Sequence, residues 1–298
     1  MLDYPAARAV ALVVQTGSFE AAARALNVTP SAVSQRVKQL EERLGVVLVE
    51  RGAPCLATGH GAWLCRHVEH VGLLEKALAG QLPGLVDPGA PTRRVTLHVA
   101  TNADSLGTWF VAAAAAFARE TGDLLDIAVD DEEHTADWLR RGRVLAAVTA
   151  LAKPVTGCHV RPIGALAYVA TASPDFMTRH FPGGVTAAAL ADAPGLTFDQ
   201  KDRLQQLWIR QTFGQAVAYP SHWLPATQSF LDASLAGMGW ALNPTPLARP
   251  HIAAGRLVEL VPGSTLERPL HWQVNRLVAD QLAPLTRCVA AAAREALA

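Results

Sequence analysis

The stretch from Gly17 to Gly45 constrains the fold of this chain more than any other part of the sequence. Apolar residues at helical spacing from Leu2 to Gln15 precede it, and Ser18 is placed to cap a second, short helix. Thr29 is placed at the N-cap of a third helix and Pro30 at its first position, where the missing N–H costs nothing. The sequence therefore predicts three short helices, the last two joined by a tight turn.

The third helix has one apolar and one polar face. Its apolar residues recur at intervals of four, three and four: Val33, Val37, Leu40 and Leu44. Its other face carries hydroxyl, amide and ammonium groups, which can read base edges when the start of a helix enters the major groove. Two arginines, one on the flank of this helix and one beyond it, are expected to contact phosphates. The predicted DNA-binding residues are Ser18, Thr29, Ser31, Ser34, Gln35, Arg36, Lys38 and Arg51. The alternative is a solvated helix in a bundle that binds no DNA.

Any binding to double-stranded DNA must be local, because the chain as a whole has no excess positive charge. Its 26 Lys and Arg residues match 26 Asp and Glu residues. With 50% hydrophobic and 17% charged residues, the 298-residue chain is typical of packed globular proteins with two or three domains.

A wing and a long helix are predicted after the third helix. Leu48 to Glu50 and Cys55 to Ala57 are expected to be two short strands, and Thr58 to cap the long helix. Apolar residues continue along this helix for several turns: Leu64, Val68, Val71, Leu74, Leu78 and Leu82. Such a stripe needs a partner, either a second copy in a homodimer or the chain's own domains. One recognition helix also offers too little interface for tight specific binding, which favours the dimer.

A Pro- and Gly-rich segment marks a boundary near residue 92. Its residues are Pro83, Gly84, Pro88, Gly89 and Pro91. We therefore expect a winged helix-turn-helix domain over residues 1–58, a linker and dimerisation helix with a hinge over 59–92, and a third domain over 93–298.

The third domain is predicted to be an α/β sensor of two lobes with a cleft between them. Strands are expected at Val95 to Ala100, Leu124 to Val129 and Val144 to Thr149, with a helix capped by Ser105 and another around Trp138. The alternation repeats after Pro162 and predicts a mostly parallel sheet, before a final strand and helix return to the first lobe. Lobe I would hold residues 93–162 and 268–298, and lobe II residues 163–267.

Ligands of open α/β sheets bind beyond the carboxyl ends of the strands. The helix after the first strand offers free N–H groups to the α-carboxylate of an amino acid. The acidic run after the second strand can neutralise an ammonium or guanidinium group, although a solvated acidic loop is the alternative. The predicted effector-binding residues are Thr101, Asn102, Asp104, Ser105, Asp130, Asp131, Thr149, Phe198, Asp199 and Gln228.

The sequence offers no support for a metal site, a cofactor or an enzyme. His60, Cys65, His67 and His70 do not share one face of a helix, and the four cysteines are scattered. There is no phosphate-binding loop and no nucleophile elbow. The chain begins without a signal sequence and has no apolar segment of membrane-spanning length, so we expect a cytoplasmic protein with reduced thiols and no membrane partner.

The chain resembles the LysR-type transcriptional regulators over essentially its whole length. The resemblance is carried by Gly17 to Ala23, Thr29 to Glu41 and Leu44-Gly45, in one register with the wing and long helix. Within that family it is most similar to the ArgP/LysG branch, which regulates export of basic amino acids. The matching runs are Thr29 to Gln35, Asn102 to Leu106, Val144 to Thr149 and Leu235 to Trp240. The wing departs from the family, with Ala53-Pro54-Cys55 where a second basic residue is frequent, so minor-groove contact by the wing stays open.

The resemblance implies a DNA-binding regulator, not an enzyme, with a periplasmic-binding-protein-like sensor domain. It further implies that lysine or arginine is the effector, that the target genes serve amino-acid export or metabolism, and that dimers pair into a homotetramer. RNA polymerase is a further candidate partner. Three alternatives are left open. The effector is either lysine or arginine, or it is an unrelated compound, or the chain is instead a solute-binding protein for transport. The missing signal sequence and the DNA-reading helix oppose the last of these.

Overall fold

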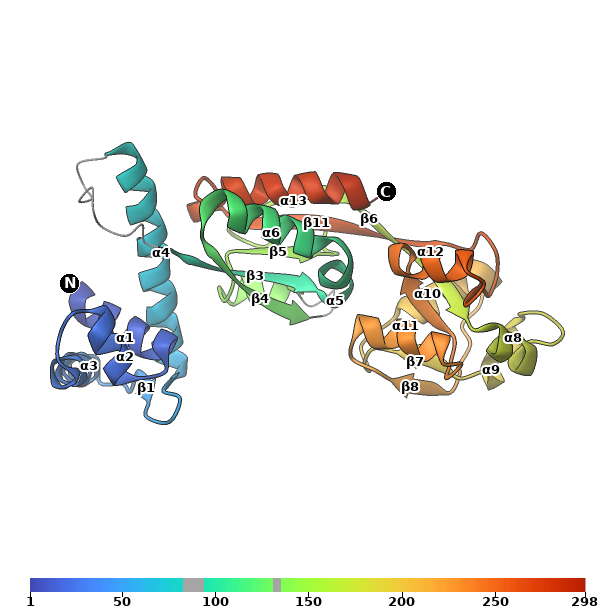
Figure 1. Ribbon diagram of the computed structural model, residues 1–298, viewed down its shortest axis with the longest axis horizontal. Helices are drawn as coiled ribbons and strands as arrows, with labels where there is room; N and C mark the ends of the chain where they lie inside the picture. The colour runs from blue at the N-terminus through green and yellow to red at the C-terminus, as the bar shows by residue number, and fades with distance from the viewer. Residues whose placement is uncertain (83–93, 131–134, 298) are drawn as a thin grey trace. The chain divides into compact units, whose positions relative to one another are not determined.

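The computed structural model describes residues 1–82, 94–130 and 135–297 (Figure 1). The chain divides into two compact units, Met1–Thr96 and Leu97–Ala298. The first unit is built from helices and a small wing, and the second is an α/β unit.

Three helices form the start of the first unit, as predicted: α1 (Tyr4–Thr16), α2 (Phe19–Ala25) and α3 (Pro30–Leu44). The side chains of Asp3, Ser18 and Thr29 accept a hydrogen bond from the backbone of the first turn of α1, α2 and α3 respectively. Gly17 and Gly45 end α1 and α3 in the left-handed conformation, at φ 71° and 70°. The apolar face of α3 is buried through Val33, Val37 and Leu40, so its polar face is turned outward.

The wing and the long helix follow. Strands β1 (Val49–Glu50) and β2 (Leu56–Ala57) pair antiparallel, and Thr58 caps α4 (Gly59–Gln81). A side chain at Gly61 would clash with the wing, because an added Cβ would lie 1.9 Å from the carbonyl oxygen of Leu48. The start of α4 is therefore packed closely against the backbone that leads into the wing.

The apolar stripe of α4 has two different surroundings. Val68 is buried in the core of the first unit, together with Cys65. Leu74, Leu78 and Leu82 are 48%, 45% and 52% exposed. Among the described residues, packing in the first unit buries Val68 in the first half of the stripe and leaves the three leucines of the second half exposed.

Lobe I of the second unit contains three strands and the helices between them. They are β3 (Thr96–Asn102), α5 (Ala103–Ser105), a π-helical segment (Leu106–Phe110), α6 (Val111–Thr121), β4 (Leu124–Asp130), α7 (Thr135–Arg140) and β5 (Ala146–Thr149). The prediction that Ser105 caps this helix is wrong. The helix starts two residues earlier, at Ala103, and the Ser105 hydroxyl is buried inside the first turn.

Lobe II alternates shorter elements. After β6 (Cys158–Ala172) come α8 (Pro174–His180), α9 (Ala187–Asp192), β7 (Gly195–Thr197), α10 (Leu204–Phe213), β8 (Ser221–Trp223), α11 (Thr227–Leu235), β9 (Ala241–Pro244), α12 (Thr245–Ala253) and β10 (Val258–Glu259). Its core includes Trp208 and Trp240, whose rings lie 5.6 Å apart. Both rings are fully buried and fill the core of this lobe.

The prediction of a mostly parallel sheet is wrong. The main sheet has the order β10-β6-β11-β5-β3-β4, with β9 also paired to β6. Strands β3 and β5 pair parallel, but β6 pairs antiparallel with β9, β10 and β11 (Leu266–Asn275), and β11 pairs antiparallel with β5. Strands β6 and β11 run from one lobe into the other (Figure 1). An alternation of strands and helices along the chain does not reveal such a long antiparallel pair between distant segments.

The end of the chain returns to lobe I, as predicted. Strand β11 pairs with β5, and the last helix α13 (Ala283–Ala296) packs against α6. Arg287 of α13 forms an ion pair with Glu120 of α6. Residues far apart in the chain therefore complete the same lobe.

Candidate functional site

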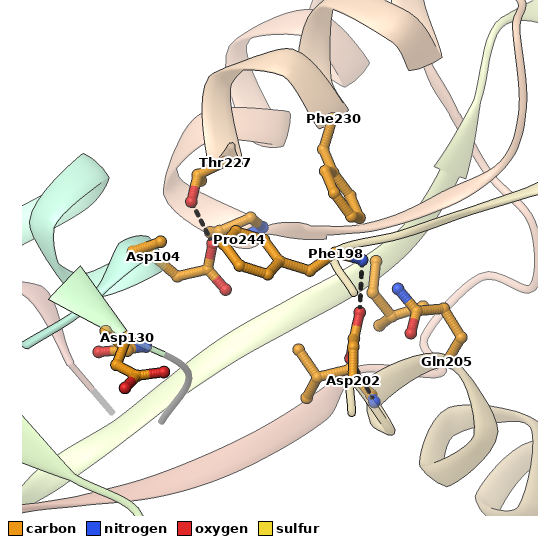
Figure 2. A pocket seen from close by; sticks show the side chains of 12 residues that line it. Asp104, Asp130, Phe198, Asp202, Gln205, Thr227, Phe230 and Pro244 are labelled. Atoms are coloured by element: carbon orange, nitrogen blue, oxygen red, sulfur yellow. Dashed lines mark hydrogen bonds between the residues drawn. The ribbon is translucent and has the colours of Figure 1, made fainter. Parts of the chain in front are cut away.

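A cleft of the second unit receives residues from both lobes (Figure 2). Its empty volume is about 510 Å³, including the part open to solvent. Its lining residues are Asn102, Ala103, Asp104, Asp130, Phe198, Asp202, Leu204, Gln205, Thr227, Phe230, Leu242 and Pro244. Four of the residues predicted from strand ends therefore lie together here: Asn102, Asp104, Asp130 and Phe198.

Asp104 of lobe I is bonded to two hydroxyl groups of lobe II. The Tyr168 hydroxyl donates to its Oδ2 at 2.8 Å. The Thr227 hydroxyl donates to its Oδ1 at 2.6 Å, and Figure 2 shows this second bond. Tyr168 is fully buried on β6, and Thr227 is the first residue of α11. The Asp104 carboxylate thus meets the start of α11, where the helix dipole favours negative charge.

Asp130 lies at the end of β4 on the lobe I side of the cleft. Its Oδ2 accepts a hydrogen bond from the indole N–H of Trp138 at 2.9 Å. This bond helps to fix the orientation of the carboxylate at the cleft lining. Asp131, also predicted as a site residue, lies outside the described residues.

Asp202 of lobe II was missed by the sequence analysis. Its two carboxylate oxygens accept backbone N–H groups, from Phe198 at 3.0 Å and from Leu204 at 2.9 Å. Asp202 is 8% exposed. Burial of a charged group among backbone donors is stabilising only when the charge is well bonded, and these bonds meet that need. An Asp two residues before a helix, after a buried strand, was the signal that could have identified it.

Two amide side chains border the cleft with an oxygen that lacks a partner among the described residues. They are Gln205 Oε1 and Asn102 Oδ1, and the two residues are 1% and 3% exposed. Gln205 Nε2 donates to the carbonyl oxygen of Leu196 at 2.8 Å, which fixes the orientation of the amide. Both oxygens are hydrogen-bond acceptors, so a ligand with N–H groups would supply the donors that they lack.

The lining carries three carboxylates, those of Asp104, Asp130 and Asp202. No lysine, arginine or histidine is among the described residues that line the cleft. Carboxylates and open amide oxygens in a partly desolvated cavity attract cations and repel anions. The arrangement can therefore hold a small cation with several N–H donors.

The other predicted effector residues lie outside this lining. Thr149 is fully buried and accepts a hydrogen bond from Gln273 Nε2 at 3.2 Å. Asp199 accepts the backbone N–H groups of two following residues, as in a turn. Gln228 is exposed and donates to Asp232. Thr101 and Ser105 are fully buried beside the lining residues.

The predicted DNA-reading residues lie at the start of α3. Ser31, Gln35 and Lys38 are exposed, and Ser34 is half-buried. Thr29 accepts the backbone N–H of Ala32 as the N-cap. Hydroxyl, amide and ammonium groups thus project from one exposed part of this helix.

Ser18 and the two predicted phosphate-contacting arginines lie in different places. Ser18 caps α2 and donates to Glu20 at 2.7 Å, and this bond lowers the pKa of the Glu20 carboxyl. Arg51 is exposed, with its guanidinium 5.2 Å from the centre of the Phe19 ring. Arg36 is half-buried and lines a hollow of the first unit with Arg8 and Glu75.

Within the part of the chain that the structure describes, no group of three or more His, Cys, Asp and Glu side chains is arranged to hold a metal ion. Over the same residues, no helix combines the length and the apolar character needed to cross a membrane.

Comparison with known protein families identifies the class. Residues 6–62 match the bacterial regulatory helix-turn-helix protein, lysR family, and residues 90–298 match the LysR substrate binding domain. The chain belongs to the LysR family of DNA-binding transcriptional regulators. Within that family it is similar to the regulators named LysG and ArgP.

Three relatives illustrate the similarity. The HTH-type transcriptional regulator LysG of Mycobacterium tuberculosis is 42% identical over 98% of this chain and 94% of its own length. The C-terminal domains of a LysR family protein from Agrobacterium tumefaciens are 64% identical, cover 68% of this chain and 99% of that chain, and superpose with a TM-score of 0.67. Full-length LysG from Corynebacterium glutamicum with bound effector Arg is 35% identical, covers 99% of both chains and has a TM-score of 0.66.

Proposed function

We propose that this regulator senses a basic amino acid, lysine or arginine, which binds in the cleft between the lobes. The observation that carries the proposal is the charge of the lining, in which Asp104, Asp130 and Asp202 face the cavity and the described lining residues include no cationic side chain. An amino acid with two cationic groups and one carboxylate fits such a surface better than a neutral or acidic one.

A relative supports the same class of effector. The Corynebacterium glutamicum LysG structure contains bound Arg, and it aligns with 99% of this chain at 35% identity. In the proposal, the α-carboxylate lies near the first N–H groups of the helix that starts at Ala103, where the helix dipole favours an anion. The effector's cationic groups are bound by the carboxylates of the lining.

The DNA-reading part of the proposal assigns base contacts to Ser31, Ser34, Gln35 and Lys38 of α3. The second half of α4, with its exposed Leu74, Leu78 and Leu82, would join two copies in a dimer. A dimer places two recognition helices on half-sites about one helical turn apart, which gives the interface needed for specific binding. The genes it controls would serve amino-acid export or metabolism.

Thermal unfolding of the full chain tests the effector. Lysine, arginine, glutamate and a neutral amino acid are added separately, since a ligand that binds the native state raises the unfolding midpoint by mass action. We expect lysine or arginine to raise the midpoint by an amount that grows with concentration, and glutamate to leave it unchanged.

The same measurement on a variant with one carboxylate fewer in the cleft tests the role of the lining's charge. Asp130→Asn removes one carboxylate charge from the cleft and keeps the shape of the side chain, so it should reduce the rise given by lysine and arginine. Asp175→Asn, on the exposed start of α8 and outside the cleft, is the matched control and should keep the full rise. No rise with either basic amino acid in the unmodified protein would overturn the proposed effector.

A further inference from the structure

The two lobes contribute chemically different walls to the cleft. Lobe I supplies Asn102, Ala103, Asp104 and Asp130, which are mostly polar. All of the larger apolar lining residues belong to lobe II: Phe198, Leu204, Phe230, Leu242 and Pro244. The aliphatic stem of a lysine or arginine side chain needs such an apolar wall, while the amino-acid head group needs polar partners. The stem of the ligand therefore fits lobe II and its head group fits lobe I.

Gln205 supplies a fixed acceptor on the apolar wall. Because Gln205 Nε2 donates to the Leu196 carbonyl oxygen, Oε1 is the amide atom that is left for another partner. This atom is buried, and no described residue donates to it. A buried acceptor without a donor is unfavourable in free energy. A ligand N–H that bonds to this oxygen removes the cost, and this favours binding of the ligand.

Asp202 supplies a charge close to that acceptor. Asp202 precedes α10 and Gln205 lies in its first turn, and both line the same side of the cavity in Figure 2. Each carboxylate oxygen of Asp202 accepts one backbone N–H, and these bonds hold the negative charge in place beside Gln205. Together the two side chains offer a negative charge and a neutral acceptor beside the apolar wall.

We propose that Asp202 and Gln205 form the subsite for the side-chain cation of the effector and determine its specificity for basic over neutral aliphatic amino acids. The ammonium of lysine or the guanidinium of arginine donates to Gln205 Oε1 and to the Asp202 carboxylate. The carbon stem packs against the lobe II residues, and the head group is left to lobe I. This assignment rests on the proposed basic amino-acid effector.

The experiment compares lysine with norleucine, which has the same carbon stem without the terminal ammonium. Thermal unfolding midpoints of the full chain are measured with each ligand for the unmodified protein and for Gln205→Met, which removes the acceptor at similar volume. We expect Gln205→Met to weaken lysine and arginine binding by about tenfold to a hundredfold, the loss expected for one hydrogen bond to a charged group. The effect of norleucine should be kept, so that the difference between lysine and norleucine shrinks.

Gln211→Met is the matched control, because Gln211 is exposed on α10, donates to the carbonyl oxygen of Thr265 and lies outside the cleft lining. It should keep the unmodified difference between lysine and norleucine. If Gln205→Met itself fails to fold, Asp202→Asn provides the second variant, since it removes the charge and keeps one acceptor oxygen for the backbone. It should reduce the lysine effect more than the norleucine effect.

Three outcomes would overturn the assignment or its basis, and they are distinguishable. A variant that keeps the full difference between lysine and norleucine shows that the cation is bound elsewhere in the cleft. Equal losses with both ligands show that Gln205 acts only through the structure of lobe II. No effect of lysine or arginine on the unmodified protein overturns the proposed effector itself.

Discussion

Cys65 illustrates how burial sets the chemistry of a single residue. It lies in the core of the first unit at 9% exposure, on the start of α4. Burial, with a smaller contribution from the nearby Glu69 carboxylate, raises the pKa of its thiol to about 11 from an ordinary value of 9.0. The thiol therefore stays protonated at neutral pH and is a poor nucleophile there.

This shifted pKa predicts a loss of stability at alkaline pH. A thiol whose pKa is higher in the folded state stabilises the protein below pH 9, and the contribution is lost as the pH rises through about 11. The difference in unfolding free energy between the unmodified protein and Cys65→Ala should fall by up to about 3 kcal/mol over this range. Urea unfolding under reducing conditions measures it. A difference that is independent of pH would contradict the burial argument.

The residues of the cleft show what strand ends can and cannot predict. That Asn102, Asp104, Asp130 and Phe198 line one cleft could be predicted because residues after strands gather at one edge of a sheet, and a strand is visible in the sequence. Thr227 and Gln205 belong to helices, and only the approach of the two lobes brings them to the cavity. Thr149 also lies at the end of a strand, but its hydroxyl accepts a hydrogen bond from the side chain of Gln273, 124 residues away in the chain. Such a partner cannot be read from local spacing.

At the scale of the element, caps and apolar stripes predicted the first unit well. Thr29, Pro30 and Gly45 fix the two ends of α3, and the bounds Pro30–Leu44 follow from local chemistry alone. Strand β6 was harder, because its 15 residues cross from one lobe to the other and change surroundings along the way. Residues 158–165 are largely outside the core, so no continuous apolar run marked them as strand.

The exposed start of α3 predicts a specific loss of DNA binding. The double variant Ser34→Ala, Gln35→Ala removes two polar side chains from this part of the helix, and each good base contact is worth about 1–3 kcal/mol. We expect binding to weaken about a hundredfold, measured by fluorescence anisotropy on DNA selected by the unmodified protein from a random pool.

Binding of the same variant to unselected DNA should change little, because phosphate contacts carry that affinity. Gln15→Ala, at the exposed end of α1, is the control and should bind selected DNA normally. Unchanged affinity of the double variant for selected DNA would count against α3 as the recognition helix.

At the scale of the whole molecule, Asp104 connects the lobes of the second unit. Its carboxylate belongs to lobe I and accepts hydroxyl groups from Tyr168 and Thr227 of lobe II. Strands β6 and β11 provide the covalent connection, and their pairing shifts register between Leu270 and His271. The arrangement of the lobes thus depends on a polar contact as well as on two continuous strands.

Removal of one of these hydroxyls should weaken the connection. Thr227→Val keeps the size of the side chain and takes away the donor to Asp104 Oδ1. We expect the unfolding free energy to fall by about 1.5–3 kcal/mol, the contribution of one hydrogen bond to a charged group, as measured by urea unfolding. Thr178→Val, at an exposed position on α8, should change it by far less. Equal stability of both variants would show that the Asp104 contact contributes little.

The path of β6 and β11 also sets the order in which the protein can be completed during synthesis. The first unit is one continuous segment at the start of the chain, and lobe II is continuous between the two strands. Lobe I is not, because β11 must pair with β5 and α13 must pack on α6, and both are made last. During synthesis, the DNA-reading unit and then lobe II leave the ribosome with all of their residues. Lobe I, in contrast, cannot be completed until about the last thirty residues have been made. Premature termination near the end of the gene would leave its sheet without the strand beside β5.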